Sequence, residues 1–445
     1  MSFLRYPRYR ASGVEWLGDV PEHWDLKRLK FCLRLVTEKA ESRTRAVALE
    51  NIESWTGRLV EGEGEYDGDG VAFVEGDLIF GKLRPYLAKV HLADRSGEAV
   101  GDFHVCRPVK GVHGRYALRY MLNPAFISTV DGSTYGAKMP RVSWDFMADL
   151  PFPIPPEIDQ HAIASFLDRE TAKIDALVEE QKRLIDLLKE KRQAVITQAV
   201  TKGLNPNAPM KPSGIEWLGD IPSHWTIRKL GHVAFMQEGP GLRNWQFTDS
   251  GTRVICVTNI TESGIDFDRY EKFISPQEYA ESYRHFTVSK GDLLLSSSGN
   301  SWGKVAVFDG DEEVILNTST IRLNEKDNAL MSVSYLFYLL MSPSVREQLA
   351  LAMTGACQPN FGPSHLSEVL VPVPTAQEQQ SIVKKLFCEI GSINNLVSEA
   401  ERATLFLLER RSAVISAAVT GGIDVRSLVR AQVEKQLEPD GMEAA

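Results

Sequence analysis

The stretch SGVEWLGDVPEHW at Ser12–Trp24 recurs as SGIEWLGDIPSHW at Ser213–Trp225, 201 residues further along the chain. Ten of the thirteen positions are identical, and two of the three differences exchange Val for Ile. Solenoid repeats have periods of about 20–50 residues, so this long period indicates a duplication into two domains. Whatever one half recognises, we expect the other half to recognise something similar.

A second pair of matching stretches closes each half. RQAVITQAVT at Arg192–Thr201 matches RSAVISAAVT at Arg411–Thr420 at seven of ten positions, 219 residues apart. Because the spacing grows from 201 to 219, the module between the matched stretches is about 18 residues longer in the second half. These modules, residues 32–150 and 233–370, mix short strands, Gly-rich turns and a few helices. The shared stretches therefore form a frame that carries two different modules.

The composition is that of a globular protein with more than one domain. At 445 residues, with 43% hydrophobic and 24% charged residues, the chain can form at least two cores. It has no apolar run of membrane-spanning length, and MSFLRYPRYR at its start has no signal-peptide core. Five cysteines without a CxxC pair fit a reducing compartment. We therefore expect a cytoplasmic protein that does not enter a membrane.

The net charge of −9 weighs against a broad basic surface for nucleic acid. Basic residues cluster only locally, as at Lys82, Arg84 and Lys89. If the chain binds DNA, we therefore expect a partner to make many of the phosphate contacts.

Residues 157–202 are predicted to form one long helix with the heptad pattern of a coiled coil, ended by Gly203. The first seam position repeats every seven residues, at Ile174, Gln181, Leu188 and Val195. Leu177 and Leu184 are assigned to the second seam position. Val178 and Ile185 widen the apolar stripe.

A second helix of similar length is predicted from about Ala376 to Thr420, where Gly421–Gly422 end it. Thr375 and Glu378 form a capping box at its start. Its seam residues are Ile393, Ala400, Leu407 and Val414. Two helices of equal length with matched seams most simply pack on each other, although each could instead lie on its own domain.

Both modules place a Gly-Asp turn before an apolar strand, at 76–80 and at 291–295. The loops that follow differ completely, since residues 81–87 read GKLRPYL and residues 296–302 read SSSGNSW. Further on, three more loop residues are exchanged: Lys138, Met139 and Arg141 stand against Cys357, Gln358 and Asn360. Binding residues sit on loops held by a rigid scaffold, so this pattern favours two readers with different targets. Free drift of the loops after duplication is the alternative.

No motif supports catalysis. Asn123-Pro124-Ala125-Phe126 is one residue from an amino-methyltransferase motif, but no Gly-rich cofactor loop precedes it, so we interpret it as a turn that opens a helix. Gly299–Lys304 is one residue short of a P-loop, and Val305 stands where Ser or Thr should be. No HExxH, Cys/His cluster or G-x-S-x-G is present.

The repeated tryptophans surround a Gly-Asp-(Val/Ile)-Pro turn: Trp16, Trp24, Trp217 and Trp225. Aromatic packing around a tight turn is the favoured interpretation. A face for partner docking is the alternative.

The layout as a whole resembles the specificity subunit of type I restriction–modification systems. The likeness rests on both Trp blocks, both Gly-Asp-Leu turns, the Pro-rich approaches at 153–160 and 372–379, and the helix ends AVITQAVTKG and AVISAAVTGG. It covers nearly the whole chain, and the motif order, occurring twice, is its most specific part. It implies an α+β fold with two globular target recognition domains, separated by an antiparallel two-helix coiled coil and related by an internal pseudo-two-fold repeat.

The resemblance also implies domain boundaries. They are target recognition domain 1 at 1–154, a first spacer helix at 155–203, a linker with target recognition domain 2 at 204–373, a second spacer helix at 374–422, and a partly disordered tail at 423–445.

On this resemblance, each recognition domain reads one half of a split site in double-stranded DNA. Two modification subunits would dock along the chain and methylate adenines with S-adenosylmethionine, and restriction subunits would add ATP- and Mg²⁺-dependent translocation and cleavage. The chain itself would catalyse nothing and bind no cofactor or metal. The shared helix ends and Trp blocks would be the docking faces, with Arg192 and Arg411 among them, and two equivalent faces predict two modification subunits.

Base reading requires hydrogen-bonding side chains at base edges, where Arg and Lys suit guanine and Asn and Gln suit adenine. In the first module the hypothesised DNA-facing residues are Lys82, Arg84, Tyr86, Lys138 and Arg141. In the second they are Ser297, Asn300, Gln358 and Asn360. Lys89 and Lys304, shared by both copies, are expected to touch phosphate or to cap a strand.

Two other classes of protein fit the repeat. One is a duplicated coiled-coil scaffold or adhesin-like interaction protein without a DNA role, and the other is a free-standing DNA-binding regulator. Capture of a methyltransferase in a pull-down separates them from the restriction–modification assignment.

Overall fold

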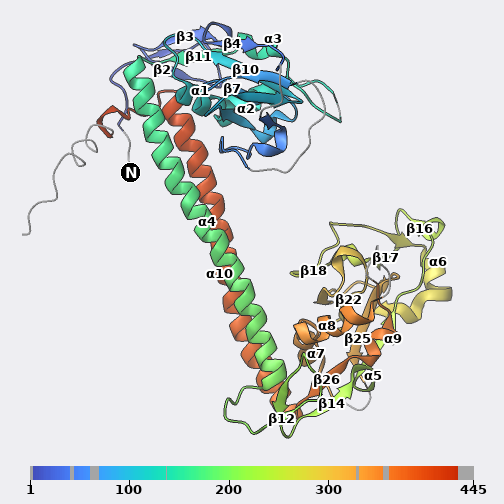
Figure 1. Cartoon of the computed structure of the whole chain (residues 1–445). Coiled ribbons are helices and arrows are strands. Elements are labelled where there is room, and N and C mark those ends of the chain that lie inside the picture. Colours follow the sequence, from blue (N-terminus) through green and yellow to red (C-terminus); the bar gives the residue numbers. More distant parts are fainter. Residues whose placement is uncertain are drawn as a thin grey trace, which may run out of the picture. The chain divides into compact units, whose positions relative to one another are not determined.

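The structure is a computed structural model that describes residues 4–40, 45–60, 70–136, 138–326, 330–353 and 360–428. The chain forms two compact units, Met1–Lys182 with Arg402–Ala445, and Arg183–Glu401. Each unit combines one globular module with one end of each long helix, α4 (Glu157–Lys202) and α10 (Ala376–Val419). The predicted α+β class is confirmed: β-rich modules accompany two long helices that pack antiparallel (Figure 1).

The first unit is built on a four-stranded antiparallel sheet with strand order β4-β10-β7-β8. β7 reads LIFG with all four residues buried, as expected of a short apolar run in the middle of a sheet. A smaller sheet, β5-β9-β6, and the strand pairs β1-β2 and β3-β11 complete the β structure. The strands are β1 Tyr9–Ala11, β2 Asp19–Pro21, β3 Asp25–Arg28, β4 Leu33–Val36, β5 Ala46–Val47, β6 Gly70–Phe73, β7 Leu78–Gly81, β8 Val90–Leu92, β9 Gly97–Val100, β10 Phe103–Pro108 and β11 Pro151–Ile154, and the short helices are α1 Gly114–Met121, α2 Pro124–Gly132 and α3 Trp144–Asp149.

The second unit repeats this plan around the sheet β15-β25-β22-β23. Its second sheet is larger, with the order β16-β20-β17-β24-β21. The separate strand pairs β12-β13, β14-β26 and β18-β19 complete the β structure of the unit. The strands are β12 Met210–Pro212, β13 Asp220–Pro222, β14 Thr226–Lys229, β15 Ala234–Glu238, β16 Phe247–Thr248, β17 Thr252–Ile255, β18 Ile260–Thr261, β19 Gly264–Ile265, β20 Phe273–Ile274, β21 Thr287–Val288, β22 Leu293–Ser296, β23 Val305–Val307, β24 Val314–Leu316, β25 Thr320–Glu325 and β26 Leu370–Val373. The short helices are α5 Leu230–Val233, α6 Pro276–Glu278, α7 Val333–Leu340, α8 Pro343–Ala352 and α9 Pro363–Glu368.

The Gly-Asp turns predicted before the apolar strands are confirmed. Gly76 and Gly291 have φ angles of 87° and 93°, a left-handed conformation that glycine adopts without steric cost. Each following aspartate, Asp77 and Asp292, accepts a backbone N–H from three residues earlier, at 2.9 and 2.8 Å. The two strands that these turns introduce therefore start in the same way in both units.

The predicted bounds of the long helices are confirmed, but one seam position was wrong. Val178 is 6% exposed, whereas Leu177 and Leu184 are 45% and 44% exposed. The seam of α4 therefore runs through Ile174 and Val178, which are four residues apart, and places Leu177 beside it. The burial of Ile393 and Ala400 (5% and 4% exposed) confirms the seam of α10.

A buried glutamine fixes the start of each long helix to its module. The side chain of Gln160 accepts the N–H of His113 (2.8 Å) and donates to the carbonyls of Gly111 and Pro155 (2.9 Å each). Gln379 makes the equivalent three bonds in the second unit, at 2.9, 2.8 and 3.1 Å. These glutamines are the last residues of the two Pro-rich approaches, so the repeated motif anchors helix to module.

Each module also holds the end of the other long helix. In the first unit, the Tyr116 hydroxyl donates to the carbonyl of Val419 near the end of α10 (3.3 Å). In the second unit, the Tyr335 hydroxyl donates to the carbonyl of Val200 near the end of α4 (3.1 Å). Both tyrosines are fully buried, so these bonds form inside the cores.

The core of the first unit contains both ends of the described chain. Ile423 and Val425 are buried in it together with Tyr6 and Trp24. The N–H of Asp424 donates to a backbone carbonyl of the N-terminal segment (2.8 Å). Of the predicted tail, 423–428 belong to this unit, and the rest of the tail lies outside the described residues.

Candidate nucleic-acid interface

Two loops of the first module form one surface. The loop between β7 and β8 meets the segment before α3, because the N–H of Arg84 donates to Pro140 (2.8 Å) and the N–H of Val142 donates to Lys82 (3.0 Å). The structure thus brings together the four cationic residues hypothesised to face DNA: Lys82, Arg84, Lys138 and Arg141. Arg84, Tyr86 and Lys138 are exposed on this surface.

Arg141 is held in place by a carboxylate. Its Nε and Nη2 donate to the two oxygens of Asp102 at 3.0 and 2.8 Å, and Lys82 Nζ lies 3.7 Å from the same group. The hydrogen bonds from Arg141 lower the pKa of the Asp102 carboxyl, with a smaller contribution from Lys82. The pair therefore stays ionised near neutral pH and leaves the remaining guanidinium N–H groups of Arg141 for a ligand.

The backbone of this loop is strained. Arg84 and Ala88 have φ angles of 50° and 47°, in the left-handed region that non-glycine residues rarely adopt. Strained residues cluster at functional sites because the surrounding fold must hold them there. Lys89, which follows, is used internally, since its ammonium group donates to the carbonyl of Leu49 (2.6 Å).

The second module repeats the frame with different side chains. The backbone of Ser297 makes the same kind of bonds as that of Lys82. Its N–H donates to the carbonyl of Ser319 (2.9 Å), and its carbonyl accepts the N–H of Phe361 (3.1 Å). Asn300 and Asn360, the residues hypothesised to face DNA, are exposed beside it. The Ser297 side chain itself is fully buried, so the structure does not present its hydroxyl to a ligand. Lys304 is half-buried, and Gln358 lies outside the described residues.

The second tryptophan of each block is a packing residue in this chain. Trp24 and Trp225 are each 1% exposed, and Trp225 donates from Nε1 to Glu378 (3.2 Å). The first tryptophans are more accessible: Trp16 is partly buried against the core, and Trp217 is 40% exposed. Only the first of each pair can contribute to a docking face.

Arg192 and Arg411 occupy equivalent seam positions but differ in environment. Arg411 is 5% exposed and bonds to Asp175 (2.8 Å) and to the carbonyl of Trp55 (2.9 Å). The side chain of Arg192 is 24% exposed and bonds to Asn394 (3.3 Å) and to a glutamate carboxylate (3.2 Å). Arg411 is therefore structural, whereas Arg192 remains accessible.

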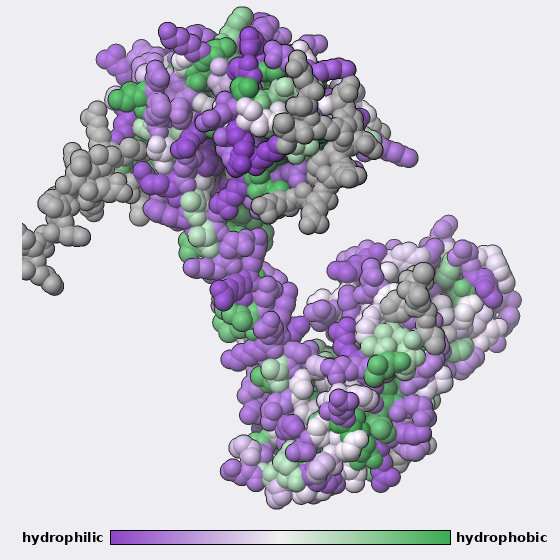
Figure 2. Space-filling view, viewed as in Figure 1, coloured by the Kyte–Doolittle hydropathy of each residue, from purple (hydrophilic) through white to green (hydrophobic). Residues whose placement is uncertain are grey.

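The helix pair presents apolar side chains outside its seam. Figure 2 shows green patches on these helices among a mainly hydrophilic surface. The exposed large apolar residues of these helices are Ile158, Leu177, Leu184, Leu187, Phe387, Leu396, Leu405, Phe406 and Leu408. Such surface is typical of protein docking faces.

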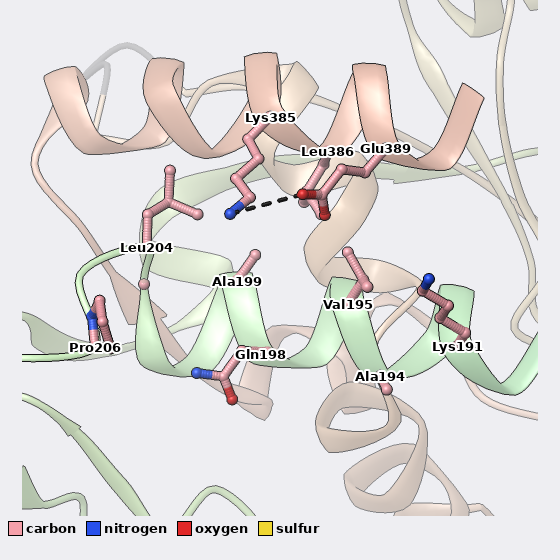
Figure 3. Close-up of a pocket in the computed structure, with 11 residues that line it drawn as sticks. Lys191, Ala194, Val195, Gln198, Ala199, Leu204, Pro206, Lys385, Leu386 and Glu389 are labelled. Atoms are coloured by element: carbon pink, nitrogen blue, oxygen red, sulfur yellow. Dashed lines mark ion pairs between the residues drawn. The ribbon is translucent and has the colours of Figure 1, made fainter. Parts of the chain in front are cut away.

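A cavity of about 440 Å³ lies between the helices in the second unit (Figure 3). Ala194, Val195 and Leu386 form part of its apolar wall, and the ion pair of Lys385 with Glu389 (3.6 Å) stands at its side. It lies at the helix ends, where docking was predicted from the sequence.

Asn123 caps α2, accepting the N–H of Ala125 (3.1 Å), so the motif that starts there opens a helix as predicted. No described group of three or more His, Cys, Asp or Glu side chains could hold a metal ion. No described helix is long and apolar enough to cross a membrane.

Comparison with known proteins gives the family. The type I restriction modification DNA specificity domain matches residues 222–395. The MjaVIII specificity subunit of Methanocaldococcus jannaschii is 25% identical over 305 residues, which is 68% of each chain. The EcoKI specificity subunit of Escherichia coli K12 is 22% identical over 414 residues, 86% of each chain. The chain belongs to the type I restriction–modification specificity subunits.

A solved structure bears out the fold of this specificity subunit. A chain from a study of complex assembly and conformational transition of the type I R-M system superimposes with a TM-score of 0.65 at 18% identity, over 90% of this chain and 98% of that chain. As a DNA specificity subunit, the chain is the non-catalytic member of a type I enzyme complex. This assignment replaces the scaffold or adhesin-like alternative.

Sequence reasoning missed several residues at the interface of the specificity subunit. Asp102, which holds Arg141, lies 39 residues away in sequence, and only the pairing of β7 with β10 brings it there. Tyr135, which pairs with Arg141, is 62% exposed, which is unusual for such a large aromatic residue. Nothing in its local sequence signalled this exposure.

Proposed function

We propose that each globular module is a target recognition domain that reads one half of a bipartite DNA site. The observation that carries this proposal is a pair of loop clusters with one backbone frame and different exposed side chains. Arg84 and Arg141 suit guanine, whereas Asn300 and Asn360 suit adenine. One frame with two sets of donors would read two different half-sites.

The proposed domain division follows the boundaries expected from the sequence. The recognition domains are residues 1–154 and 204–373, and the spacer helices are residues 155–203 and 374–422. In this proposal the antiparallel helices set the distance between the half-sites, at about one turn or 10 base pairs of DNA.

The partners proposed are double-stranded DNA, two modification subunits and restriction subunits, all in the cytoplasm. The exposed apolar residues of the helix pair and the cavity at its end support docking of a protein there. S-adenosylmethionine, ATP and Mg²⁺ would be used by those partners, and the chain would bind none of them.

Replacing Arg84 and Arg141 separately by Ala tests the reading role of the first module. Each change should weaken binding of the preferred site by about 1–3 kcal/mol and relax specificity in one half-site only. Asn300→Ala and Asn360→Ala are the matched variants and should relax the other half-site. Binding of random-sequence libraries by the chain assembled with its modification subunits measures both effects. Losses below about 1 kcal/mol for both arginines would remove them as base readers.

Lengthening both spacer helices by one heptad tests their role as a ruler. Seven residues add about 10 Å at 1.5 Å per residue, or about three base pairs at 3.4 Å each. The selected sites should therefore contain a different spacer between unchanged half-sites. An unaltered spacer would contradict the proposal, and thermal unfolding of the lengthened chain controls for its folding.

A further inference from the structure

Three cationic side chains surround one small cavity in the second unit. The cavity measures about 90 Å³ and lies between α4, the loop after β22, and α8. Arg192, Lys304 and Arg346 come from these three elements, and Glu262 is the one carboxylate among the described lining residues. The lining is therefore net positive and suits an anion.

Arg346 contacts the candidate reading loop. Its guanidinium lies 4.9 Å from the ring centre of Trp302, a cation–π contact. Gly303, next to Trp302, has a φ angle of 77°, in the left-handed region that favours glycine. Within the described residues, no hydrogen bond or ion pair occupies the N–H groups of the Arg346 side chain, and these are the groups that grip phosphate.

The arginine at the helix in this cavity, Arg192, is more accessible to an anion than its counterpart Arg411 in the first unit. Arg411, equivalent to Arg192, is buried with a carboxylate, and Lys89, equivalent to Lys304, donates to a backbone carbonyl. Within the described part of the chain, Lys304 and Arg346 form no ion pair, and the Glu262 carboxylate beside Arg192 is 69% exposed. At this helix position, the second unit thus keeps an accessible arginine where the first unit buries one against Asp175.

The geometry points to this cavity as a binding site for a backbone phosphate of DNA, next to the bases that Asn300 would read. The inference rests on the proposed function of the loop that carries Asn300. Phosphate contacts fix the register of a protein on the duplex without reading sequence.

The test compares Arg346→Ala, Lys304→Ala and the double variant, each in the full chain assembled with modification subunits. DNA binding is measured at several salt concentrations, on the preferred duplex and on a scrambled duplex. The slope of log K against log salt should become shallower by about 0.9 in the double variant, the value for one phosphate, equally on both duplexes. Arg346→Lys should keep the slope because it keeps the charge.

Lys290→Ala is the matched control. Lys290 precedes β22, at the end opposite the reading loop, and its ammonium pairs with Asp311 (2.8 Å). Its removal should leave the slope unchanged. Thermal unfolding of every variant establishes that it is folded.

An unchanged slope in the double variant would overturn the inference. So would a loss confined to the preferred duplex, which indicates base reading, or a loss of assembly, which indicates a partner contact. Binding of inorganic phosphate alone, with no effect on the DNA slope, would mark the cavity as a general anion site and overturn it too. Asn300→Ala distinguishes failure of the phosphate site from failure of the proposed function. If Asn300→Ala changes the sequence preference but the double variant leaves the salt slope unchanged, only the phosphate site is contradicted.

Discussion

Replacing Asp175 by Ala should destabilise the first unit by about 3–5 kcal/mol, because it leaves a buried guanidinium without its carboxylate. Arg411 Nε lies 2.8 Å from Asp175, and the two side chains are 6% and 16% exposed. Burial lowers the pKa of Arg411, and the carboxylate of Asp175 opposes that effect. Arg58 also pairs with Asp175 (3.0 Å), but its side chain is 57% exposed and adds little.

Chemical unfolding followed by calorimetry should show this loss in the transition of the first unit alone. Asn394→Ala is the matched control, because Asn394 is the equivalent partner of Arg192 in the second unit. The side chain of Arg192 is 24% exposed and keeps its contact with Glu262, so the control should cost less than about 1 kcal/mol. Equally small losses of unfolding free energy in both variants would show that the ion pair of Arg411 with Asp175 does not stabilise the first unit.

Replacing Trp225 by Ala should destabilise the second unit by about 3–5 kcal/mol, as expected for removal of a fully buried tryptophan. Trp225 is 1% exposed in the core of that unit and donates to Glu378 (3.2 Å). Its hydrogen bond, with those of His224 and Thr375, keeps the pKa of Glu378 lowered although burial acts in the opposite direction. The measurement is the unfolding free energy of the second unit.

Trp217→Ala is the control from the same repeated block. Trp217 is 40% exposed, so its removal should change the unfolding free energy by about 0.5 kcal/mol. If Trp225→Ala left stability intact but abolished copurification of a modification subunit, the block would be a docking face and its packing role would be wrong.

The frame of the molecule could be predicted from the sequence because its signals are local. Heptads, a capping box and terminal glycines placed both long helices, and α4 spans the predicted residues 157–202. The choice of Leu177 over Val178 failed because both lie within one helical turn of Ile174, and only the partner helix decides between spacings of three and four.

The interface was predictable only in part. The loops carrying Arg84 and Arg141 were expected to share a surface, and their backbones do meet. The burial of Ser297 and the pairing of Asp102 with Arg141 depend on strands that are distant in sequence, and no local pattern encodes such pairings. The same holds for the stacking of Arg346 on Trp302 from a separate helix.

The core of the first unit includes Val414, Val419 and Val425 from the far end of the chain. During synthesis, the apolar layer of the first module cannot close until residues 414–425 have been translated, after the whole second module. The second unit, drawn from the continuous segment Arg183–Glu401, has no such delay. The order of folding on the ribosome should thus be the reverse of the order of translation, and the early module is the one exposed to aggregation in the interval.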